Sequence, residues 1–100
     1  MPTFIYKLQL LETFKHPENH TDDFNNTILA HFEYLKFHFE RGIIKVVGRT
    51  TLPFDDPNLF GLCIFDADDE NNAITFMHND PVIVKGIMSG EVLPFNLIFI

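Results

Sequence analysis

The order of strand-like and helix-like stretches constrains this 100-residue chain more than any other feature. Residues 3–11 alternate large apolar side chains with their neighbours at the period of two that is typical of a strand, and residues 91–100 alternate in the same way. Between them lie two helix-like segments and two apolar, β-branched runs, over residues 43–47 and 58–66. The predicted order is strand, helix, strand, strand, helix, strand, within a single domain that covers residues 1–100.

The first helix is predicted to begin after Asp22 or Asp23, either of which can act as its N-cap. Its apolar stripe recurs at spacings of three and four residues and comprises Phe24, Ile28, His31, Leu35 and Phe39. Arg41 and Gly42 are predicted to end this helix, because glycine accepts the left-handed backbone conformation at that position.

The second helix is predicted to begin at Asp68 or Asp69 and to stop before Pro81. Its buried face should comprise Ala73, Phe76 and Met77. Residues 12–23 and 51–57 are polar and contain prolines, so both segments are predicted to be loops.

This element order predicts an α+β fold of the ferredoxin-like βαββαβ type, a four-stranded antiparallel sheet with two helices on one face. Large apolar side chains occur at both parities of the first and last predicted strands, so the uncovered face of the sheet should be apolar as well. An apolar face of that size favours contact with a second copy of the chain. We therefore expect a homodimer.

Charge and composition exclude several partners and locations. The net charge is -7 and the only arginines are Arg41 and Arg49, which disfavours binding to nucleic acid or to an anionic membrane. The longest apolar run, residues 61–65, is far shorter than the roughly 20 residues of a membrane span. Cys63 is the only cysteine and cannot form an intrachain disulfide, so we expect a cytoplasmic protein in which it is a small core residue.

Two side chains stand out as candidates for chemistry. His31 lies on the apolar stripe of the first helix, where an imidazole could transfer protons near neutral pH. Asp80 ends the second helix and could approach His31 if the two helices lie side by side. The alternatives are a core histidine with satisfied hydrogen bonds and an aspartate that only forms the turn before Pro81.

Metal and cofactor sites are not expected. His16 and His20 are four residues apart, but Pro17 between them argues against the helix that such a zinc pair needs. The acidic clusters lack the spacing of a calcium loop, and no glycine-rich phosphate loop occurs. We therefore predict neither a bound metal nor a cofactor.

Several short motifs then stand in one ungapped frame. They are the His-x-x-Tyr-Leu pattern of residues 31–35, followed by Arg41-Gly42, Ala67-Asp68, Asp80-Pro81 and Gly86. As a set they resemble the YciI-like (YCII-related) family over residues 27–98. The resemblance implies a ferredoxin-like subunit that pairs into a dimeric α/β barrel, with a pocket between sheet and helices. It also implies a histidine and aspartate pair as the acid/base machinery, here His31 and Asp80.

The chain departs from that family where substrate contacts are concerned. Thr27 and Ile28 stand where the family often carries an arginine, and Arg49 replaces a common proline. Arg49 could instead pair with a substrate carboxylate, although a plain surface arginine is the alternative. Tyr34 of the His-x-x-Tyr-Leu pattern is the second candidate for substrate binding.

Three roles for the chain remain open. The first is a cofactor-independent lyase or isomerase that acts on a small carbonyl-containing or cyclic metabolite through His31 and Asp80. The second is a noncatalytic module that binds a small molecule in the same pocket. A purely structural dimer is the third alternative.

Overall fold

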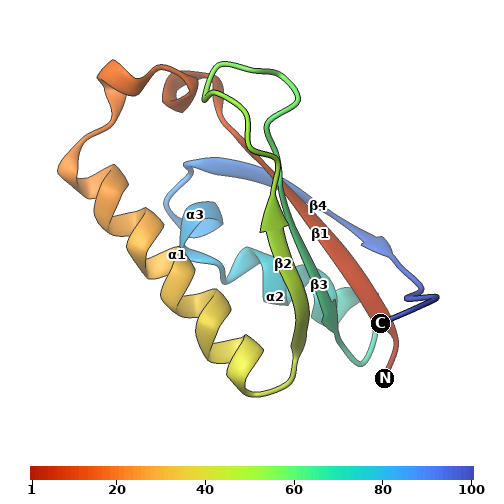
Figure 1. Ribbon diagram of the computed structural model, residues 1–100. Coiled ribbons are helices and arrows are strands. Elements are labelled where there is room, and N and C mark those ends of the chain that lie inside the picture. The colour runs from red at the N-terminus through yellow and green to blue at the C-terminus, as the bar shows by residue number, and fades with distance from the viewer.

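The computed structural model describes residues 1–100 and contains one four-stranded antiparallel sheet with all helices on one face (Figure 1). The strands are β1 (Thr3–Leu10), β2 (Ile44–Arg49), β3 (Gly61–Asp66) and β4 (Met88–Pro94). Their order across the sheet is β2-β3-β1-β4, and every neighbouring pair is antiparallel. This arrangement confirms the predicted α+β ferredoxin-like fold.

The sheet is covered by α1 (Asp22–Glu40), α2 (Glu70–His78) and the single turn α3 (Pro81–Val84). The N-cap of α1 is Thr21 rather than either predicted aspartate, because the Thr21 hydroxyl accepts a hydrogen bond from the Phe24 backbone N–H at 3.2 Å. The predicted cap of α2 is correct, since the Asp69 carboxylate accepts from the Asn72 backbone N–H at 2.8 Å. Gly42, with φ of +78°, follows α1 in the left-handed conformation that its position predicted.

The last strand was predicted too far along the chain. It spans Met88–Pro94 instead of residues 91–100, and its register pairs Met88 with Leu10 and Pro94 with Phe4. Because β1 begins at Thr3, residues beyond 95 have no neighbouring strand left to pair with. Alternation alone does not show where the partner strand ends.

The two central strands also differ from their predicted bounds. The predicted run over residues 58–66 begins as a strand only at Gly61, because Gly61 pairs with Arg49, the last residue of β2. β2 in turn continues two residues beyond the predicted run of 43–47, to Arg49. The loop predicted over residues 12–23 contains two short 3-10 helices, η1 (Glu12–Lys15) and η2 (Pro17–Asn19).

Pro81 has a second role besides ending α2. It occupies the first turn of α3, where its missing backbone N–H costs nothing. The N-cap of α3 is Asp80, whose carboxylate accepts from the Val82 backbone N–H at 3.1 Å. This turn places the Asp80 side chain inside the fold.

The two faces of the sheet have different environments. On the helix face, Val47, Cys63, Tyr6 and Val92 form one row across all four strands, and Tyr6 and Cys63 are almost completely buried. The opposite face carries a row made of Val46, Ile64, Ile5 and Leu93. Val46 and Leu93 are 45% and 49% exposed, so this row is apolar and open at its edges. The same face also carries Lys7, Gln9 and Glu91, so it is less apolar than predicted. None of the helices combines the length with the hydrophobicity that spanning a lipid bilayer requires.

Candidate active site

The carboxylate of Asp80 lies at the centre of the candidate site. It is 0% exposed and accepts hydrogen bonds from Tyr6 Oη at 2.8 Å, from His31 Nδ1 at 2.7 Å and from the Val82 backbone N–H at 3.1 Å. Burying a carboxylate is costly unless its oxygens are hydrogen-bonded. These three donors supply that compensation, so the group is held in one position.

Three separate elements bring these side chains together. Tyr6 points from β1 toward the helices, His31 lies on the inner face of α1, and Asp80 sits at the junction of α2 and α3. Figure 1 shows α3 beside α1, and residues of these two helices are in contact. The contact between His31 and Asp80 that the two helices were expected to make is therefore present.

The second ring nitrogen of His31 is free. A carboxylate only accepts hydrogen bonds, so Nδ1 carries the hydrogen and the lone pair of the neutral ring is on Nε2. Nε2 forms no hydrogen bond with the protein. Every buried side-chain nitrogen and oxygen has a hydrogen-bond partner, so Nε2 is not buried. Nε2 of His31 is therefore accessible, and the His31 side chain lines a cavity.

This cavity lies between α1 and the sheet and has a volume of about 670 Å³. Most of its wall is apolar and includes Leu8, Ile28, Leu35 and Val47. Its polar side chains are His20, Asn25, His31 and Arg49. A mostly apolar cavity of this size with a few polar groups is typical of small-molecule sites.

The predicted substrate residues Arg49 and Tyr34 differ in their placement. Arg49 is exposed at the end of β2, lines the cavity and forms no ion pair. Arg49 lies in the same row of the sheet as Leu8, which is two residues from Tyr6 on β1, or about 7 Å along the strand. The structure therefore brings Arg49 to the same cavity as His31.

Tyr34 does not line this cavity. Its hydroxyl donates to the Phe76 backbone carbonyl at 2.7 Å, which ties α1 to α2, and burial raises the pKa of Tyr34 well above its usual range. Its ring also packs against Phe76 of α2, with ring centroids 5.4 Å apart. The structure therefore does not bring Tyr34 to the cavity that His31 lines.

Tyr6 is the part of the site that sequence reasoning missed. Burial raises its pKa far above the ordinary tyrosine value, so its hydroxyl stays protonated and donates to Asp80. A tyrosine among the apolar residues of a strand carries no signal of such a contact. Cys63 beside it is 1% exposed, as expected of a core residue, and burial raises the pKa of the thiol to about 12. It is therefore not a thiolate at neutral pH.

His38 of α1 and His16 of the preceding segment lie outside the cavity. His38 is half-buried, and burial, reinforced by the nearby Arg41, lowers its pKa. It does not line the cavity. His16 is exposed, and no group of three or more His, Cys, Asp or Glu side chains is arranged to hold a metal ion.

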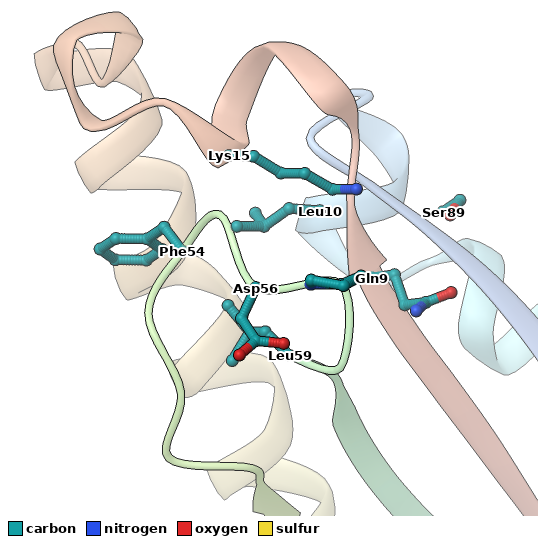
Figure 2. Close-up of a pocket in the computed structure, with 8 residues that line it drawn as sticks. Gln9, Leu10, Lys15, Phe54, Asp56, Leu59 and Ser89 are labelled. Atoms are coloured by element: carbon teal, nitrogen blue, oxygen red, sulfur yellow. The ribbon is translucent and has the colours of Figure 1, made fainter.

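Figure 2 shows a smaller cleft of about 210 Å³, which shares Leu10, Phe54 and Leu59 with the wall of the cavity. Its charged side chains have local partners: Lys15 pairs with Glu12 at 3.4 Å, and Asp56 accepts from the Asn58 backbone N–H at 2.8 Å. The cleft holds no buried titratable group. The candidate site is therefore the larger cavity, where the buried pair is.

The chain thus combines a ferredoxin-like sheet with a buried His–Asp pair that lies under its helices beside a mostly apolar cavity. More particularly, residues 9–96 match the YCII-related domain, and the chain belongs to that family. This agrees with the resemblance found in the sequence and extends it toward the N-terminus. A search of curated proteins returned no match.

The solved structure of 5-chloro-2-hydroxyhydroquinone dehydrochlorinase from Burkholderia phenoliruptrix, in complex with 2,5-dihydroxybenzoquinone, is similar to this chain. The TM-score is 0.68 at 18% sequence identity, and the likeness covers 94% of this chain and 93% of that chain. At this level of identity the likeness establishes a shared fold.

Proposed function

We propose that this chain is a cofactor-independent lyase or isomerase that moves a proton on a small carbonyl-containing or cyclic metabolite. The observation that carries the proposal is the imidazole of His31, which Asp80 holds through Nδ1 while Nε2 remains accessible at the cavity. An imidazole oriented in this way by a buried carboxylate is suited to general acid/base chemistry.

In the proposed step, Nε2 of His31 removes a proton from a carbon next to a carbonyl group. The electron pair of the broken C–H bond moves into the carbonyl to form an enolate. In a lyase, the enolate re-forms the carbonyl, a C=C bond forms to the next carbon, and the bond from that carbon to the leaving group breaks with its electron pair going to the leaving group. The proton then passes from His31 to the leaving group or to water. An isomerase instead returns the proton to a different carbon. Asp80 stabilises the imidazolium that forms and acts as a positioning residue, held in place by Tyr6.

Arg49 is proposed to bind an anionic group of the substrate. Its guanidinium has no partner in the chain and belongs to the wall of the cavity. The dehydrochlorinase structure holds a small ring compound, which supports a ligand of similar size here. A noncatalytic ligand-binding module is the second candidate, and the largely apolar wall of the cavity favours it, because such a wall retains a ligand without any reaction.

Turnover measurements separate these two functions. The unmodified chain would be incubated in D₂O with 5-chloro-2-hydroxyhydroquinone and with a series of unsaturated lactones. We expect release of chloride, or deuterium incorporation next to the carbonyl, at rates well above those in buffer. Binding of these compounds without any release or exchange would contradict the enzyme and favour the binding module.

We also propose that the chain forms a homodimer, arranged as a dimeric α/β barrel, through the open face of the sheet. Val46 and Leu93 are exposed at the two ends of an apolar row there, and such faces are normally covered. Sedimentation at micromolar concentration should give about twice the chain mass of 11.6 kDa. Val46→Lys should give a monomer, whereas Val84→Lys, 67% exposed on α3, should not. A monomeric unmodified chain would exclude this assembly.

A cytoplasmic location and the absence of nucleic-acid or membrane partners are part of the same proposal. The buried free thiol of Cys63 suits a reducing compartment, and the net charge of -7 repels phosphate backbones and anionic lipids.

A further inference from the structure

A second imidazole lines the cavity, that of His20 in the segment between η2 and α1. Its Nε2 lies 2.7 Å from the Phe14 backbone carbonyl oxygen, and a carbonyl oxygen only accepts, so Nε2 carries the hydrogen. The lone pair of the neutral ring is therefore on Nδ1. No protein group bonds this nitrogen, and no buried side-chain nitrogen lacks a partner, so Nδ1 is accessible.

Aromatic contacts fix the orientation of this ring. His20 is stacked on Phe24 with ring centroids 3.9 Å apart and an interplanar angle of 10°. Phe54 contacts it edge-on, with centroids 4.9 Å apart. The Phe14 carbonyl and these two rings thus fix the orientation of His20, whose ring hydrogen is on Nε2, whereas that of His31 is on Nδ1.

The two histidines lie toward different ends of the cavity. Phe24, on which His20 stacks, precedes His31 by seven residues on α1, which is about two turns or ~10 Å along the helix axis. A ligand that reaches both histidines therefore passes an apolar wall, with Ile28 between them, and an apolar ring with a polar group at each end fits such a wall.

We propose that His20 is a second ligand-binding residue and that the ligand is a ring compound with a hydrogen-bonding group at each end. One group, a hydroxyl or an enol, donates to Nδ1 of His20, and the opposite end of the ring meets Nε2 of His31. The role of His31 in this inference rests on the proposed function, whereas the role of His20 does not. It adds a substrate class, that of rings substituted with oxygen at opposite positions.

Calorimetric titrations with hydroquinone and phenol, under anaerobic conditions, test this proposal. Hydroquinone carries hydroxyls at both ends of its ring and phenol at one end. The unmodified chain should bind hydroquinone about fivefold more tightly than phenol, which is the effect of one additional neutral hydrogen bond. His20→Phe keeps a flat ring on Phe24 but removes the acceptor, so it should abolish this difference.

His16→Phe is the matched control, because His16 is an exposed histidine of the same segment that does not line the cavity, and its affinities should not change. Imidazole ¹⁵N spectra of the unmodified chain give a second measurement that needs no variant, and hydroquinone should shift the Nδ1 signal of His20. Equal affinity for the two ligands, no binding of hydroquinone, or an unmoved Nδ1 signal would overturn the inference. Two-ended binding without any turnover would instead leave this inference intact and contradict the enzyme.

Discussion

Replacing His31 with asparagine should lower turnover by a factor of about 10²–10⁴, the usual contribution of a general acid or base, while leaving the chain folded. The buried Asp80 carboxylate loses its imidazole partner in this variant, but the asparagine amide can still donate a hydrogen bond to it. It cannot exchange a proton near neutral pH. Initial rates would be measured on the substrate that the turnover assays identify, and circular dichroism would check the fold.

His78→Asn is the matched control for this variant. His78 is an exposed histidine at the end of α2 that does not line the cavity, so its replacement should leave the rate unchanged. A folded His31→Asn variant with the full rate would contradict the assignment of the base. Unfolding of that variant would instead make His31 a structural residue.

Replacing Asp80 with alanine should reduce the free energy of unfolding by about 3 kcal/mol or more, because each buried donor left without an acceptor costs about 1–3 kcal/mol. The change leaves Tyr6 Oη, His31 Nδ1 and the Val82 backbone N–H without their acceptor, all of them inside the fold. It also removes the N-cap of α3. Urea unfolding of both proteins measures the difference.

Asp68→Ala provides the comparison for that measurement. Asp68 is exposed and its side chain forms no hydrogen bond or ion pair, so its replacement should change stability by no more than about 0.5 kcal/mol. A loss below about 1 kcal/mol for Asp80→Ala would mean that the three hydrogen bonds of Asp80 contribute little to stability. Asp80→Asn, which keeps the shape of the side chain, should lower turnover less than His31→Asn, because the imidazole remains.

Much of the fold follows from local patterns in the sequence. The alternation of Phe4, Tyr6, Leu8 and Leu10 correctly predicts the buried face of β1. The stripe of three- and four-residue spacings likewise turns His31 inward from α1. Such patterns work because each element must direct its apolar side chains to one core, whichever element lies opposite.

The limits of these patterns appear at element ends and junctions. Alternation continues through residues 95–100, but β4 ends at Pro94 because β1, its partner, begins at Thr3. The Asp80-Pro81 pair correctly predicts the end of α2, but the same two residues also begin α3. In both places the outcome depends on a neighbouring segment that a local pattern does not contain.

For the candidate site, the sequence by itself determined that His31 faces the core and, through the family motifs, that Asp80 is its partner. Only the tertiary structure decided that Tyr6 binds the same carboxylate from 74 residues away and that His20 reaches the cavity. The physical reason is that periodicity specifies which face of an element is buried, whereas contacts between elements depend on sheet register and helix packing. Those contacts give Asp80 its three donors and leave one accessible nitrogen on each of two histidines.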